Sequence, residues 1–184
     1  MAARGVFALA MFDRQAARYF NFSRSGLVSS FIAVLAVAAF ELVVSALLGQ
    51  SNMFESLVQT VIVYAALIAS TWLFARQIDR MDAMVPFIVT INWSNAALSL
   101  AMMVTVLVGL GLIAPVLMGA AVIVTINIAR LIMTLKALQI VLLILAQVVG
   151  LVAAVLVLGM MFPLTEEEQA QLERMQTELS SPQQ

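Results

Sequence analysis

The chain is built from long apolar stretches separated by short polar ones. Each apolar stretch holds about 20 residues, and a helix of that length, rising about 1.5 Å per residue, crosses the hydrocarbon core of a bilayer. Strands need far fewer residues than this. The pattern predicts an all-α, polytopic transmembrane helical bundle over residues 27–162. Its five spans are expected at residues 27–48, 57–75, 86–110, 114–134 and 137–161.

The boundary between the last two spans is the least marked. Residues 116–162 are apolar almost throughout, which is too long for one span and matches two. We expect the turn between Arg130 and Lys136, although no glycine or proline stands there. Four spans with a re-entrant segment are the alternative.

Composition removes several classes of protein. Hydrophobic residues make up 64% of the chain and charged residues 10%, which excludes a soluble domain. Cysteine and histidine are absent, and with them the usual ligands of zinc, copper and haem iron and the usual proton shuttle at neutral pH. We therefore expect no cofactor, no metal and no enzymatic activity. Nucleic-acid binding is not expected either, because the few basic residues are explained by membrane topology.

Residues 1–26 precede the first span and are expected to lie in the cytoplasm. Their short apolar stretch is followed by Asp13 and Arg14 and has no small-residue cleavage site, which argues against a signal peptide. A helix over residues 7–22 would place aromatic side chains on one face, with Arg14 and Arg18 elsewhere. We expect a short amphipathic interfacial helix whose two arginines contact lipid headgroups. A solvated basic leader is the alternative.

Residues 163–184 form an acidic tail after the last span. Five of the ten acidic residues lie there, and Thr165 with Glu168 matches a helix capping box. A short surface helix is expected from Glu166 to about Leu179, followed by a disordered end.

Basic residues alternate between successive connections, and this pattern indicates the orientation. Lysine and arginine stand before the first span, in the second connection and near the fourth, whereas the first and third connections have none. Cytoplasmic loops retain these residues, so we expect a cytoplasmic N-terminus and an extracytoplasmic tail. The regular alternation and compact loops favour a bacterial inner membrane.

Glu41 is the one acidic residue deep within a span. It lies roughly 10 Å from the outer end of the first span, level with Tyr64 of the second and more than about 10 Å from the depth of Arg130. One interpretation makes Glu41 a proton or cation site. The other keeps it protonated and hydrogen-bonded to Tyr64, a backbone carbonyl or another subunit.

A second polar set lies in the cytoplasmic half of the spans. Asn92 and Asn95 are three residues apart, as are Asn127 and Arg130, so each pair is expected on one helix face, where the two pairs can meet. The functional interpretation is a headgroup or ligand pocket open to the cytoplasm. The structural interpretation is interhelical hydrogen bonding plus an arginine that reaches the interface.

Two short motifs resemble the Yip1 family. Ile91–Asn95 (INWSN) is similar to an Asn-Trp element of proteobacterial proteins of this kind, and Thr134–Leu138 (TLKAL) to the Lys-Ala-Leu step between the last two spans. A cytoplasmic segment followed by five closely spaced helices also resembles the small bacterial members. The likeness covers roughly residues 10–162. It implies a membrane-embedded scaffold without catalytic residues, because eukaryotic members act in vesicle trafficking with small GTPases and membrane partners.

These observations favour a non-enzymatic scaffold or accessory subunit that acts through helix–helix and lipid contacts. Its expected partners are membrane lipids and either further copies of the chain or another membrane protein. The alternative is a small transporter or channel-type protein that uses Glu41. An enzyme acting on lipid would need a second catalytic group beside Glu41, and the sequence shows none.

Overall fold

Five long helices follow the five apolar stretches. The computed structural model describes residues 1–49 and 53–162, and over that part of the chain the expected all-α bundle with five spans is confirmed. With the short helical turns around α5, all five are long and apolar enough to cross a bilayer, so the chain is a multi-pass membrane protein. The predicted acidic tail lies outside the described residues. The long helices are α2 (Arg24–Leu47), α3 (Met53–Gln77), α4 (Met84–Leu107), α5 (Ala114–Asn127) and α6 (Ala137–Met161).

Several shorter elements flank the long helices. The helix α1 (Ala2–Ala10) and the 3-10 turn η1 (Ala16–Tyr19) precede α2. The 3-10 turns η2 (Met81–Ala83) and η3 (Gly111–Ile113) lead into α4 and α5, and the π-helical turn η4 (Ile128–Ile132) ends α5.

Local sequence sets several helix boundaries. The side chain of Ser23 accepts a hydrogen bond from the backbone N–H of Gly26 at 3.3 Å, which caps the start of α2. Gly49 and Gly109 adopt φ of +73° after α2 and α4, a left-handed conformation that glycine reaches without strain. Pro115 stands in the first turn of α5, where its missing N–H costs no hydrogen bond.

The chain turns between α5 and α6 without glycine or proline. The turn falls at residues 133–136, inside the predicted interval, and the helices on both sides of it are long and apolar enough to cross a bilayer, which favours five spans over four. Thr134 adopts φ of +54°, which is strained for a β-branched residue. The backbone N–H of Leu135 donates to the Ala129 carbonyl at 3.0 Å, so the turn is closed by a backbone hydrogen bond.

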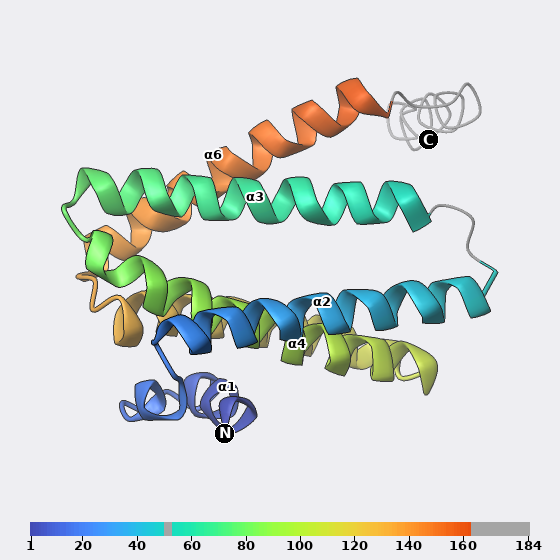
Figure 1. Cartoon of the computed structure of the whole chain (residues 1–184), viewed down its shortest axis with the longest axis horizontal. Helices are drawn as coiled ribbons and strands as arrows, with labels where there is room; N and C mark the ends of the chain where they lie inside the picture. Colours follow the sequence, from blue (N-terminus) through green and yellow to red (C-terminus); the bar gives the residue numbers. More distant parts are fainter. Residues whose placement is uncertain (50–52, 163–184) are drawn as a thin grey trace, which may run out of the picture.

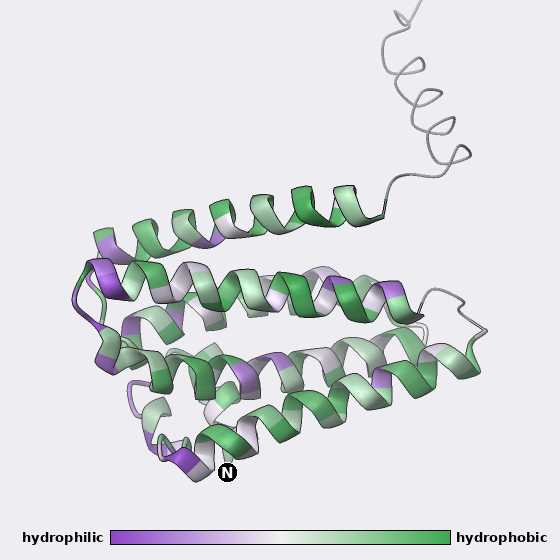
Figure 2. Ribbon diagram, turned by 45° about the horizontal axis from the view of Figure 1, so that its top comes forward, coloured by the Kyte–Doolittle hydropathy of each residue, from purple (hydrophilic) through white to green (hydrophobic). Residues whose placement is uncertain are grey.

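The helices run lengthwise side by side (Figure 1). The main partner of α3 is α6, and the main partner of α2 is α4, which also contacts α5. The start of α2, the α3–α4 connection and the α5–α6 connection all lie at one end of the bundle, which we call the basic end. Figure 2 shows that hydrophilic residues gather mainly there. Its lysine and arginine residues include Arg24, Arg76, Arg80, Arg130 and Lys136.

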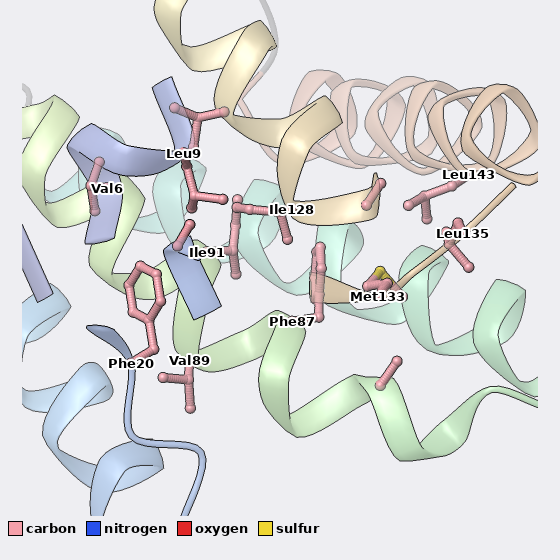
Figure 3. Close-up of a cluster of buried hydrophobic side chains, with 14 of the residues drawn as sticks. Val6, Leu9, Phe20, Phe87, Val89, Ile91, Ile128, Met133, Leu135 and Leu143 are labelled. Carbon is pink, nitrogen blue, oxygen red and sulfur yellow. The ribbon is translucent and has the colours of Figure 1, made fainter. Parts of the chain in front are cut away.

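The hydrophobic core lies towards the basic end. Its buried side chains come from the N-terminal segment, the end of α3, the first half of α4, the end of α5 with η4, and the start of α6 (Figure 3). Phe87, Ile128, Met133 and Leu143 are each at most 1% exposed. The helices are therefore held together most tightly in this half of the bundle.

The opposite half of the helices is packed much less closely. Within α2, all of whose residues are described, the buried residues are Gly26 and Ser30, both close to the basic end. Ala154 of α6, 3% exposed, is one of the few buried residues far from that end. Large apolar side chains are exposed there on every long helix, among them Val43, Phe54, Val104, Met118 and Leu156.

The N-terminal segment corrects the sequence prediction. A continuous helix over residues 7–22 is wrong, because α1 ends in a turn at Phe12, whose φ is +58°. α1 packs against α4 and α5, and the side chains of Leu9 and Ala16 are fully buried. One side of the segment therefore belongs to the protein core instead of resting only on lipid. Its exposed large apolar residues include Phe7, Met11 and Phe12.

Glycine at position 5 allows α1 to fold back against η1. A β-carbon at Gly5 would lie 2.6 Å from the ring of Phe20 and 2.9 Å from Cβ of Tyr19, closer than such atoms approach. The amphipathic pattern of the sequence suggested a single helix, but the chain gains more contact by turning and burying Leu9 against the bundle.

Candidate functional site

The buried amide of Asn92 joins three helices. Asn92 lies in α4 and is fully buried; its Oδ1 accepts a hydrogen bond from the hydroxyl of Tyr64 in α3. Its Nδ2 donates to Oγ of Ser30 in α2 at 3.0 Å. The Ser30 hydroxyl in turn donates to the Leu27 carbonyl at 2.7 Å. These bonds hold α3 to α4 and α4 to α2. In apolar surroundings, separating the helices would leave polar atoms unpaired, which costs free energy.

This network corrects the predicted neighbour of Glu41. Depth along the helices suggested Tyr64, but the Tyr64 hydroxyl bonds to Asn92 instead. Glu41 is half-buried in the loosely packed half of α2, and no hydrogen bond joins it to any described residue through its side chain. Depth alone does not fix which helix faces meet, and that is why the pairing was wrong.

Asn127 connects the bundle to the N-terminal helix. It is 1% exposed, and its Nδ2 donates to the Leu9 carbonyl at 2.7 Å. The same carbonyl accepts from the backbone N–H of Phe12 at 3.2 Å, so Asn127 adds a second, shorter hydrogen bond at the end of α1. Among the described residues, Oδ1 of Asn127 and Oγ of Ser94 are buried without a hydrogen-bond partner.

Asn127 and Arg130 do not form the paired face that their spacing suggested. The π-helical turn η4 begins directly after Asn127 and widens the helix, so residues three apart no longer stand above one another. Arg130 is exposed, whereas Asn127 points to α1. Asn95 is half-buried and bonds to none of the described residues through its side chain. The expected meeting of the two pairs is therefore wrong.

Arg80, one of the basic residues of the second connection, holds the basic end together. Nη2 of Arg80 donates to the Met133 carbonyl at 2.8 Å and to Oγ1 of Thr134 at 2.9 Å. Nε of Arg80 lies 3.3 Å from Oδ1 of Asp82. These contacts tie the α3–α4 connection to the α5–α6 connection. One of them is made to Thr134, the residue with the strained backbone.

A second interhelical contact also escaped sequence reasoning. Nε2 of Gln147 in α6 donates to Oγ1 of Thr71 in α3 at 3.2 Å. One turn further along α6, Gly150 approaches Ser70 so closely that a β-carbon would lie 3.0 Å from the serine side chain. A glutamine near the middle of an apolar span was the available signal, since such amides often bond across a helix interface.

Arg14 and Arg18 are both exposed in the N-terminal segment. Nη1 of Arg18 donates to Oε1 of Gln15 at 3.3 Å. Their contact with lipid headgroups remains a prediction. Among the described residues, no group of three histidine, cysteine, aspartate or glutamate side chains is placed to hold a metal ion.

Comparison of the chain with protein-family models, curated proteins and solved structures finds no match. No functional residues can therefore be carried over from a relative, and the candidate functional residues are those that the polar contacts described above identify.

Proposed function

We propose that this protein is a non-enzymatic membrane scaffold or accessory subunit that acts through helix–helix and lipid contacts, as the Yip1 resemblance implies. Glu41 is the observation that carries the proposal. Lipid chains can cover the exposed apolar face of α2, but they offer no hydrogen bond to a carboxyl group at membrane depth. A polar group of a neighbouring helix, from another membrane protein or a second copy of the chain, would supply one.

The other polar groups of the spans support a structural role. Asn92 bonds to Tyr64 and Ser30, Gln147 bonds to Thr71, and these two sets join different helix pairs. They hold the helices together instead of forming a line of polar groups across the bundle. This arrangement favours a scaffold over a transport pathway.

The test places a cysteine beside Glu41. Ser45 lies one turn away on the same helix face, and the chain has no cysteine of its own. In the membrane, Ser45→Cys should cross-link to a second copy or to a defined membrane protein, and adding Glu41→Leu should reduce the cross-link severalfold. Glu55→Gln, near the start of α3, is the matched control and should leave it unchanged. A strictly monomeric protein that cross-links to nothing would contradict the proposal.

The transport alternative makes a different prediction for Glu41. Liposomes containing the purified protein would show a proton or solute flux that Glu41→Gln abolishes. Equal flux with both proteins, or no flux with either, would count against transport through Glu41.

We further propose that the protein resides in a bacterial inner membrane with its N-terminus in the cytoplasm. The gathering of lysine and arginine at the basic end supports this orientation.

A further inference from the structure

A cavity opens between α1 and the turn that leads to η1. Its volume is about 480 Å³, within the usual range for sites that bind small molecules, about 300–1,000 Å³. Most of its wall is apolar, and the charged side chains are one arginine and one aspartate. It is lined by Ala3, Arg4, Phe7, Ala8, Met11, Asp13 and Tyr19.

The two charges of the cavity are available to a ligand. Arg4 and Asp13 do not form an ion pair with each other; the ion pair found among residues 1–49 and 53–162 joins Arg80 to Asp82. Oδ1 of Asp13 accepts a hydrogen bond from the backbone N–H of Gln15 at 2.8 Å, which orients the carboxylate and leaves its second oxygen for a ligand. A ligand that carries one negative and one positive group complements this wall.

We propose that the cavity binds the headgroup of an aminophospholipid, a phosphate diester linked to a primary ammonium. The guanidinium of Arg4 pairs with the phosphate, and the carboxylate of Asp13 accepts hydrogen bonds from the ammonium. A choline headgroup has no N–H to donate to Asp13. A glycerol headgroup has no positive charge to offset that carboxylate.

The surroundings of the cavity favour a lipid over a free phosphate ester. Phe7 and Met11 line the cavity and are 68% and 65% exposed, so they offer apolar surface beside the charged groups. The segment lies alongside membrane-spanning helices, near the basic end (Figure 1). Acyl chains can cover these two side chains while the headgroup occupies the cavity, which a water-soluble ester cannot do.

The wall of the cavity is fixed by the protein core. Leu9 of α1 is fully buried and its carbonyl is held by Asn127, while Gly5 allows Tyr19 to approach. The backbone of this wall is therefore held in place before a ligand binds, while the exposed side chains of Arg4, Phe7 and Met11 become ordered on binding. The inference goes beyond the scaffold proposal, because lipid binding here requires neither a partner protein nor Glu41.

The test measures lipid binding to the full-length protein, delipidated in detergent, by native mass spectrometry. Phosphatidylethanolamine, phosphatidylcholine and phosphatidylglycerol with the same acyl chains are titrated separately. The ethanolamine lipid should bind about tenfold more tightly than either of the others. Asp13→Asn, which keeps an acceptor for Gln15, should remove this preference, and Arg4→Gln should weaken binding of all three lipids.

Two further variants complete the experiment. Ala3→Trp should fill the cavity and reduce binding of the ethanolamine lipid without changing any charge. Arg14→Gln removes an exposed charge of the same segment outside the cavity and should leave the preference intact. Tighter binding of phosphatidylglycerol, equal binding of the ethanolamine and choline lipids, or an unchanged preference in Asp13→Asn would each overturn the proposal.

Discussion

Asn92 uses both ends of its amide group inside the bundle. It accepts from Tyr64 and donates to Ser30, so one fully buried side chain fixes the positions of α2, α3 and α4 relative to one another. α2 and α3 share few direct contacts, so this network is their main polar connection. Loss of the bond to Tyr64 should loosen the contact of α3 with α4, and loss of the bond to Ser30 should loosen the contact of α2 with α4.

Tyr64→Phe and Asn92→Ala test this role. Each should lower the free energy of unfolding by about 0.5–2 kcal/mol, the usual range for interhelical hydrogen bonds in membranes, with Asn92→Ala at the upper end because it removes two bonds. Unfolding by sodium dodecyl sulfate in mixed micelles measures the change. Asn95→Ala, one turn away on the same helix, is the control and should change stability by less than about 0.5 kcal/mol.

The sequence indicated that Asn92 and Tyr64 are polar groups at membrane depth, but not that they bond to each other. Hydropathy and residue counting give the depth of a side chain; its partner depends on which helices are neighbours and how each is rotated about its axis. Neither quantity follows from local sequence. The same gap explains why Ser30 and Thr71, which look unremarkable in apolar spans, were not singled out.

At the scale of elements, α1 behaves as part of the bundle. Its buried side, with Val6, Ala8 and Leu9, packs against α4 and α5, and Asn127 holds the Leu9 carbonyl. A membrane-surface helix without this contact would exchange freely with lipid. The hydrogen bond and the packing together should keep α1 docked.

Asn127→Leu should release α1. Leucine keeps the approximate volume but leaves the Leu9 carbonyl only the longer bond from the Phe12 N–H, which lies within the N-terminal segment itself, so the buried face of α1 should become more accessible. A cysteine at Ala8, which is 7% exposed, should react with a maleimide several times faster when Asn127→Leu is present. A cysteine at Phe7, which is 68% exposed, should react at the same rate in both backgrounds. Unchanged labelling at position 8 would show that packing alone holds the helix.

The long helices were predictable because hydrophobic length and turn residues determine them locally. α3 nevertheless starts at Met53, four residues before its predicted start at Leu57, because Glu55 and Ser56 extend the helix and an acidic residue is favourable in a first turn. α1 was not predictable in this way: the break at Phe12 and the burial of Leu9 depend on α4 and α5, which come much later in the sequence.

At the scale of the whole molecule, the bundle is tightly packed at the basic end and open in its other half. Arg80 joins two connections at the basic end, and the hydrophobic core lies close by. The exposed apolar side chains of the other half require lipid or neighbouring helices around them. The composition of the sequence showed that the helices need apolar surroundings. It did not show that close packing is concentrated at the basic end and exposed apolar surface in the other half.

The orientation of the molecule gives one further prediction. In intact spheroplasts of a bacterial host, a membrane-impermeant maleimide should label a cysteine at Leu112, which is 94% exposed in the α4–α5 connection. A cysteine at Lys136, exposed at the basic end, should react only after the membrane is permeabilised. The reverse pattern would show that the basic end lies outside the cell.

The contact between Asn127 and Leu9 also constrains how the chain is made. The two residues are 118 positions apart, so α1 leaves the ribosome long before the helix that will hold it. During that interval the apolar side of the nascent N-terminus has to be shielded by lipid or by the insertion machinery. Docking of α1 then becomes a late event of biogenesis, completed only after the fourth span has entered the membrane.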